Sequence, residues 1–88
     1  MGLSHQVVNF QIKMLHQAIA AFDRCKHDER LTSATTLAVS GKTYGKMVEK
    51  LRTLRSELLE MARGDNDPDR VYELTINLFP LSAAGEKQ

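Results

Sequence analysis

A run of apolar residues at alternating steps of three and four, between residues 44 and 61, constrains this chain more than any other sequence feature. Because an α-helix turns about 100° per residue, this spacing places the side chains on one stripe of a single helix. The stripe is a heptad-like seam about two and a half heptads long, and coiled coils usually need at least three or four. Leu59 and Ala62 widen the stripe, which favours a helix packed against its own chain over a zipper with a partner helix. The seam residues are Tyr44, Met47, Leu51, Leu54, Leu58 and Met61.

The sequence also indicates where this helix begins and ends. Ser40 precedes it and can accept hydrogen bonds from the free N–H groups of its first turn. Gly64 follows Arg63 at the position where a left-handed residue often ends a helix, and residues 65–68 read as a turn. The sequence therefore predicts a capped helix, a left-handed glycine and a tight turn.

An earlier helix is expected near the start of the chain. Its apolar positions again advance by three and four residues along one stripe. Gln11 lies within the apolar arc, and a buried amide without partners would destabilise the fold by about 1–3 kcal/mol. The stripe comprises Val8, Ile12, Leu15, Ile19 and Phe22, with Val7, Met14, Ala18, Ala21 and Cys25 beside it.

Two segments change to a period of two, which is typical of strands. Residues 32–39 alternate and are rich in β-branched side chains, and Val71 to Leu81 alternates apolar and polar positions over a longer stretch. Pro80 suggests that the second strand ends there or lies at a sheet edge. The order helix, strand, helix, strand predicts an α+β, two-layer domain with a βαβ unit over residues 1–81, followed by a flexible tail at 82–88.

Two strands are too few for a stable sheet, and both would leave unpaired edges. Pairing between two copies would resolve this, so we expect a homodimer that completes the sheet. The candidate interface residues are Leu51, Leu54, Leu58, Leu74, Ile76, Leu78 and Phe79.

Composition limits the classes of function. The 88 residues, 42% of them hydrophobic, suffice for one core, and a net charge of +1 implies neither an acidic tail nor a strongly basic nucleic-acid binder. Lys42, Lys46 and Lys50 form a basic ridge, but glutamates interleave with it, so direct nucleic-acid binding is not expected. The single cysteine, Cys25, fits a reducing cytoplasm, and neither a signal peptide nor a membrane span is expected.

The motifs that could carry chemistry are all incomplete, so we expect no enzyme, cofactor or metal site. The Gly41-Lys42-Thr43 run follows a predicted strand and opens a helix, as a phosphate-binding loop does, but the glycine required five residues earlier is Thr36. The alternating aspartates 65, 67 and 69 lack the glycine and glutamate of a calcium loop. Histidines 5, 16 and 27 lack metal-ligand spacing, and Cys25 lies on an apolar helix face.

The last predicted strand is similar to the C-terminal signature of a bacterial family of helix-turn-helix transcriptional regulators. Residues 67–81, DPDRVYELTINLFPL, resemble a stretch close to VYQLNIQLFPL that ends the C-terminal domain of this family, a domain of unknown function. The resemblance extends upstream over nearly the whole chain, through Asn9, Phe10, Met14, Leu15, Ala18, Glu29 and Arg30. The resemblance implies a longer chain whose N-terminal part binds DNA. The present sequence departs from the family pattern at Gln11 and Leu31.

Three functional hypotheses follow. The first is a non-catalytic dimerisation or regulatory domain of a transcriptional regulator. The second is a small-molecule sensor with Gln11, Ser33, Thr35 and Tyr72 as polar pocket contacts. The third, more distant, is a nucleotide-binding module built on Gly41-Lys42-Thr43.

Overall fold

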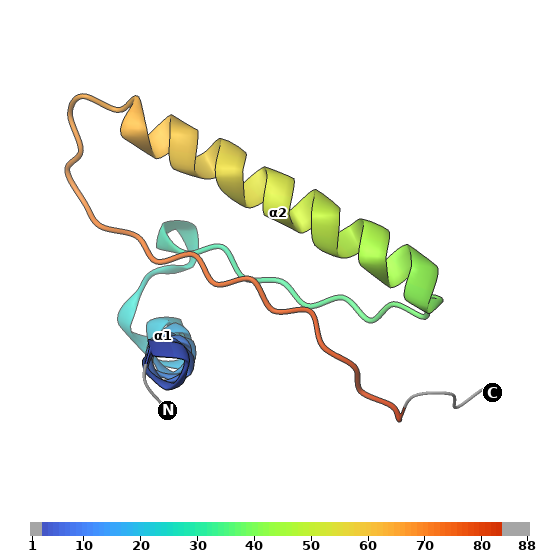
Figure 1. Ribbon diagram of the computed structural model, residues 1–88. Helices are drawn as coiled ribbons and strands as arrows, with labels where there is room; N and C mark the ends of the chain where they lie inside the picture. Colours follow the sequence, from blue (N-terminus) through green and yellow to red (C-terminus); the bar gives the residue numbers. More distant parts are fainter. Residues whose placement is uncertain (1–2, 84–88) are drawn as a thin grey trace. The chain divides into compact units, whose positions relative to one another are not determined.

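The structure, a computed structural model that describes residues 3–83, contains two long α-helices and one short 3-10 turn (Figure 1). Helix α1 spans Leu3–Arg24, η1 spans His27–Glu29 and α2 spans Gly41–Arg63. The described residues divide into two units. One comprises residues 3–37 with Tyr72–Thr75, and the other comprises Ala38–Val71 with residues 76–83.

The predicted α+β fold is wrong, because residues 3–83 contain no strand. The segments predicted as strands, 32–39 and 71–81, run between and after the helices without ladder pairing. No hydrogen bond among the described residues involves 31–39 or 71–83. Alternation is a property of one segment, whereas a strand requires hydrogen bonds to a second one. The described residues therefore form neither the predicted βαβ unit nor the strands that dimerisation was expected to complete into a sheet.

Helix α2 begins where the sequence predicts. Ser40 has extended backbone angles, and its hydroxyl accepts the N–H of Thr43 at 3.2 Å. The carbonyl of Ser40 accepts the N–H of Tyr44 at 2.9 Å, which is the first bond of the helical ladder. The side-chain cap satisfies one of the donors that every helix N-terminus leaves free.

The end of α2 differs from the prediction in one respect. Gly64 follows Arg63 as expected, but its φ of −82° and ψ of −6° are right-handed rather than left-handed. Its N–H donates to the carbonyl of Glu60 at 3.0 Å, so the residue continues the helical hydrogen bonding for one more step. The turn beyond is confirmed: the N–H of Asp67 donates to the carboxylate of Asp65 at 3.0 Å, which forms an Asx turn.

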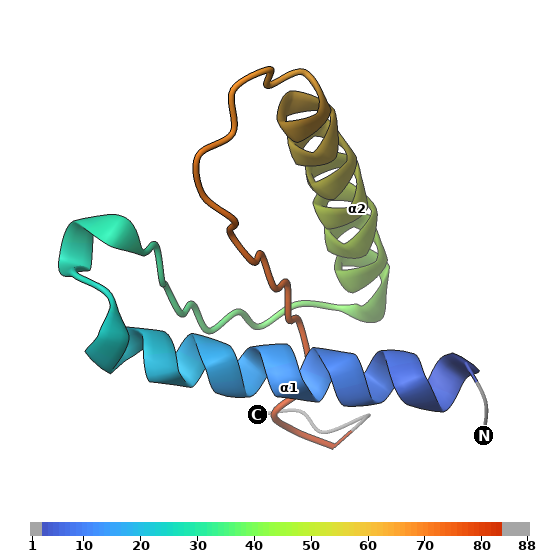
Figure 2. The same cartoon turned by 90° about the vertical axis from the view of Figure 1, so that its left-hand side faces the viewer.

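Helix α1 forms as expected (Figure 2), but the half-buried side chains lie on a different stripe of it. The expected stripe remains exposed, from 38% at Leu15 to 66% at Ile19. The half-buried side chains lie along the flank of that stripe, at Met14, Ala18, Ala21 and Cys25. Gln11 is exposed, so its amide incurs no burial cost.

No side chain within residues 4–83 is buried, and large apolar side chains are exposed along both helices and the C-terminal segment. The helices are held by their own backbone bonds and by short-range caps. Neither described helix is sufficiently long and apolar to cross a bilayer. Of the predicted flexible tail, residues 84–88 lie outside the described residues.

The Ser40 cap generates the first prediction. Ser40→Ala should destabilise the chain by about 0.5–2 kcal/mol, because the N–H of Thr43 loses its acceptor. Urea unfolding followed by circular dichroism at 222 nm measures the change. Ser56→Ala is the matched control, since Ser56 lies inside α2 and alanine has the higher helix propensity there. Equal effects of the two substitutions would contradict the capping role.

The right-handed conformation of Gly64 leads to the second prediction. Gly64→Ala should leave stability unchanged or raise it by about 0.4–1 kcal/mol, because alanine adopts these angles freely. A Cβ there would lie 3.6 Å from the carbonyl oxygen of Glu60, an ordinary contact. Gly45→Ala, where a Cβ meets nothing within 4 Å, is the control for a favourable helical site. A loss above about 1 kcal/mol for Gly64→Ala alone would indicate a left-handed residue instead.

Candidate functional site

The most prominent surface of α2 is its apolar seam. Met47 and Leu51 are half-buried, whereas Leu54 is 47% exposed and Met61 is 70% exposed. Tyr44 and Leu58, at 42% and 36%, complete the stripe. Single exposed leucines are common on protein surfaces, but six apolar side chains at heptad spacing form a continuous face. This face is suited to packing against another helix.

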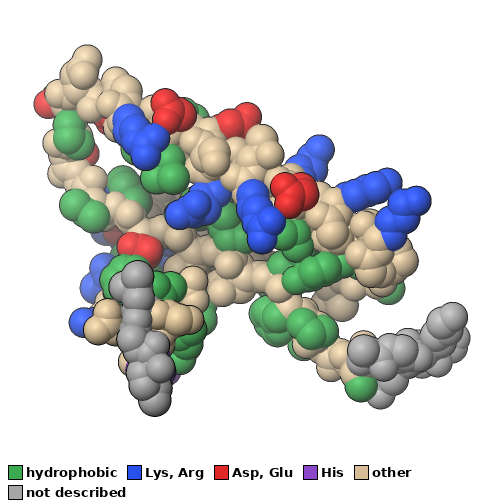
Figure 3. Space-filling model, viewed as in Figure 1, with side chains coloured by type: hydrophobic (Ala, Val, Ile, Leu, Met, Phe, Trp, Pro, Cys, Tyr) green, Lys and Arg blue, Asp and Glu red, His purple; other side chains and the backbone are tan. Residues whose placement is uncertain are grey.

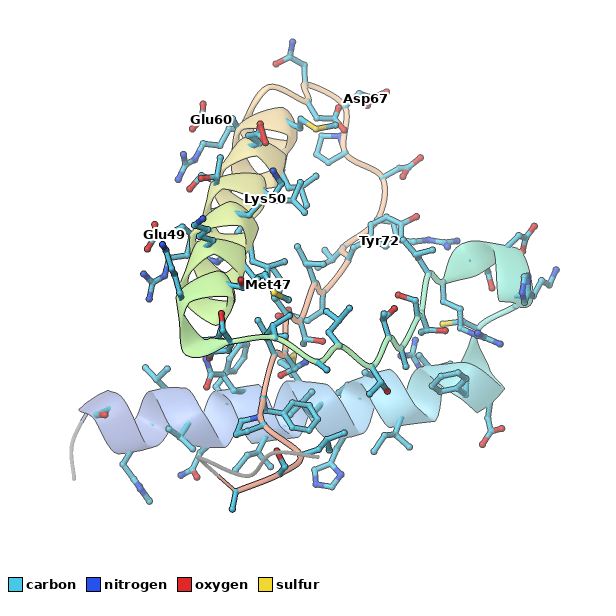
Figure 4. All side chains as sticks on the ribbon, turned by 90° about the vertical axis from the view of Figure 1, so that its right-hand side faces the viewer. Met47, Glu49, Lys50, Glu60, Asp67 and Tyr72 are labelled. Atoms are coloured by element: carbon cyan, nitrogen blue, oxygen red, sulfur yellow. The ribbon has the colours of Figure 1, made fainter. Side chains whose placement is uncertain are left out.

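Charged side chains lie on the remaining surface of α2 (Figure 3). Glu49 pairs with Arg52 at 2.9 Å, and Glu60 pairs with Arg63 at 2.5 Å. All four side chains are about 70% exposed, so each pair contributes only a few tenths of a kcal/mol. Glu49 and Glu60 project from the side of the helix opposite Met47 (Figure 4).

The basic ridge on α2 is present, with acidic residues interleaved as expected. Lys42, Lys46 and Lys50 follow one another at one-turn intervals within the helix. Arg52, beside the ridge, is already engaged with Glu49. The ridge thus forms part of a mixed-charge face rather than a uniformly positive one, which is the weaker arrangement for holding phosphates.

The C-terminal segment 71–81 carries the remaining predicted interface residues. Leu74 is 56% exposed, Phe79 is 66% exposed and Ile76 is 38% exposed, whereas Leu78 is half-buried. None of them lies in a strand. The segment is therefore an exposed apolar stretch without the sheet geometry that the alternation predicted.

The predicted polar pocket receives no support from the placement of its residues. Gln11, Ser33 and Thr35 are exposed, and Tyr72 is 72% exposed. No hydrogen bond within the described chain joins any two of them. A pocket requires polar groups that converge in a sheltered space, and these four are open to water.

The incomplete chemical motifs have structural roles. The N–H of Thr43 is bonded to the hydroxyl of Ser40, and Thr36 lies on the irregular segment before α2. Asp65 accepts a hydrogen bond within its own turn. Across residues 3–83, no three His, Cys, Asp or Glu side chains are grouped so that they could hold a metal ion.

One contact near the end of α1 does not follow from the sequence patterns described above. The guanidinium carbon of Arg30 lies 4.8 Å from the centre of the Phe22 ring, within the range of a cation–π interaction. Arg30 is half-buried, and its Nε has no hydrogen-bond partner. Between the two residues, the N–H of Lys26 donates to the carboxylate of Glu29 at 2.8 Å and stabilises the η1 turn. The sequence does contain one signal for this contact: an aromatic residue in the last turn of a helix is followed closely by a capped turn and an arginine.

This contact generates the third prediction. Phe22→Leu should destabilise the chain by about 0.5–1 kcal/mol more than Phe10→Leu, because among residues 3–83 a cation contacts the ring of Phe22 and not that of Phe10. Phe10 is the matched control, since both rings are 54% exposed and both belong to α1. Urea unfolding of the two variants measures the difference. Equal losses would show that the Arg30 contact contributes nothing to stability.

Comparison with known proteins gives one match. The profile of a family described as Domain of unknown function (DUF4423) matches residues 2–81. No curated protein matches the chain. No solved structure matches it either.

Proposed function

The chain belongs to the DUF4423 family of domains of unknown function, and we propose that it is a non-catalytic dimerisation and regulatory domain of a transcriptional regulator. The observation that carries the dimerisation part is the apolar seam of α2, in which Met47 and Leu51 are half-buried and the other four side chains are exposed. Six side chains at heptad spacing lie on one stripe of a 23-residue helix, and none of them is buried. Leaving such a face in water is unfavourable by about 25 cal/mol per Å² of apolar area that a partner could cover.

A second copy of the chain is the partner we propose for this seam. Association of two seams would remove Leu51, Leu54 and Leu58 from water on both subunits at once. We propose that the apolar side chains of the C-terminal segment, Leu74, Ile76, Leu78 and Phe79, also take part in the interface between the two copies. They would contribute as an apolar stretch and not as a sheet edge.

The regulatory part of the proposal rests on the resemblance of residues 67–81 to the terminal signature of helix-turn-helix regulators. In this proposal DNA is bound by an N-terminal part of a longer chain, and the present domain joins two such parts. The mixed charge of α2, with Glu49 bonded to Arg52, supports a role that does not include direct binding of nucleic acid. A lone Cys25 without a disulfide supports a cytoplasmic location.

The fourth prediction tests dimerisation. The chain should have the mass of a dimer at tens of micromolar, measured by size-exclusion chromatography with light scattering. Leu54→Asp should shift it to a monomer, because a carboxylate in the seam would have to be desolvated on association. Leu59→Asp is the matched control. Leu59 is 41% exposed against 47% for Leu54. At 100° per residue it lies about 110° from the centre of the six seam residues, at the edge of the widened stripe, so its substitution should weaken the dimer less.

The outcomes separate clearly. A monomer for the unsubstituted chain at this concentration would overturn the proposed function. A dimer that Leu54→Asp and Leu59→Asp weaken equally would place the interface elsewhere on the chain. Circular dichroism at 222 nm checks that both variants keep their helices.

A further inference from the structure

We propose that α2 pairs in antiparallel orientation with α2 of a second copy, so that Lys50 of each subunit faces Glu57 of the partner subunit. This inference rests on the proposed dimer and specifies its geometry. It follows from three observations on α2: the register of the seam, the charges that have no ion-pair partner among residues 3–83, and the charges that a parallel pair would bring together.

The seam has a register that suits antiparallel packing. Its six residues occupy alternating a and d positions of the heptad, beginning with Tyr44 at a. Antiparallel helices place each a residue in a layer with a d residue of the partner. Centred between residues 52 and 53, the pairing joins Leu51 to Leu54 of the partner subunit, Leu58 to Met47 of the partner subunit, and Tyr44 to Met61 of the partner subunit. All six side chains are then used in both subunits.

The two ion pairs of α2 do not involve the charges that flank the seam. Glu49–Arg52 and Glu60–Arg63 occupy b, c and f positions, which point away from the seam. At the g positions beside the seam lie Lys50 and Glu57, and neither has an ion-pair partner among residues 3–83. Charges at e and g set the orientation of paired helices. The same register that aligns the seam places Lys50 opposite Glu57 of the partner subunit, twice per dimer.

Parallel pairing would bring like charges together. In a parallel coiled coil a g residue faces the e residue five positions later on the partner helix. That rule places Lys50 against Arg55 of the partner subunit, also twice per dimer. Antiparallel pairing instead places Arg55 beside Val48 of the partner subunit, where its aliphatic stem can cover an apolar side chain. Charge therefore favours one orientation and disfavours the other.

Lys50 and Glu57 are each unfavourable within their own helix. Lys50 lies one turn after Lys46, and Glu57 lies three residues before Glu60, so each has a like charge as a helical neighbour. Reversing either charge would turn a local repulsion into a local attraction. Loss of dimer on such a reversal could therefore not be attributed to a weaker helix.

The charge distribution along the chain agrees with this orientation. Residues 41–55 contain five cations, Lys42, Lys46, Lys50, Arg52 and Arg55, and one anion, Glu49. Residues 56–70 contain five anions, Glu57, Glu60, Asp65, Asp67 and Asp69, and two cations, Arg63 and Arg70. Antiparallel helices place the basic half of one subunit beside the acidic half of the other.

The fifth prediction is a charge-reversal experiment on the full chain. Lys50→Glu and Glu57→Lys should each weaken the dimer, raising its Kd about tenfold at low salt, because two attractive pairs become repulsive. The double variant should return to within about threefold of the original Kd, since the pairs are restored with their signs exchanged. Sedimentation equilibrium at 50 mM salt measures all four proteins. At 500 mM salt the differences should shrink through screening. The control is Lys46→Glu, at a c position away from the seam, which should change Kd less than threefold.

The outcomes distinguish this inference from the proposed function. A stronger dimer for Lys50→Glu would mean that the substitution removes a repulsion with Arg55 of the partner subunit. The helices would then be parallel, and the inference would be overturned. If none of the reversals changes the Kd of a dimer, α2 does not pair in this register and the inference is overturned while the dimer stands. If the unsubstituted chain is a monomer, both fail.

A distance measurement provides an independent check. Spin labels are attached at Lys42→Cys in a Cys25→Ser background, one on each subunit. At a rise of 1.5 Å per residue, the two labels would be separated along the helix axis by about 30 Å in an antiparallel pair and by almost nothing in a parallel pair. Labels at Thr53→Cys are the matched control, because position 53 lies near the centre of the register and has a small offset in both orientations. Pulsed electron spin resonance should give a long distance for residue 42 and a short one for residue 53. Short distances at both positions would refute the antiparallel pair.

Discussion

The structure of this chain depends on hydrogen bonds between near neighbours. The backbone bonds of its helices, caps and turns join residues no more than four apart, such as Tyr44 to Ser40 and Gly64 to Glu60. A helix satisfies its own backbone in this way, and most of its stability in proteins normally comes from packing of an apolar face. Here the helices form, yet no side chain of residues 4–83 is buried. The apolar faces are consequently what this chain offers for further contacts.

The apolar faces, rather than the polar groups, suggest a function for this member of the family. A domain of unknown function is usually approached through its polar or titratable groups, but here those groups have local roles. Ser40 caps a helix, Asp65 stabilises a turn and Glu49 pairs with its neighbour Arg52. The apolar seam of α2, flanked by Lys50 and Glu57, takes no part in these hydrogen bonds and ion pairs. An assembly role is the function that such a surface favours.

The parts of the fold that were predicted correctly are those that depend on near neighbours. The periodicity of residues 44–61 identified α2, the serine at position 40 identified its cap, and the aspartate at position 65 identified the turn. The sheet was predicted wrongly because residues 32–39 and 71–81 satisfy the local requirement for strands but form no ladder. Gly64 was assigned a left-handed conformation because glycine often adopts it at helix ends, whereas here the helical bonding continues through it. The contact between Arg30 and Phe22 was missed because it depends on how the η1 turn redirects the chain.

The sequence by itself determined the two helices, the limits of α2 and the apolar stripe along it, because these follow from side-chain spacing and from hydrogen bonds within a few residues. It also determined which charges flank that stripe. Only the tertiary structure decided that the alternating segments are not strands, that Gln11, Ser33, Thr35 and Tyr72 stay open to water, and that Lys50 and Glu57 have no ion-pair partner among residues 3–83. These outcomes depend on which distant residues meet, and no pattern within one segment specifies its partner.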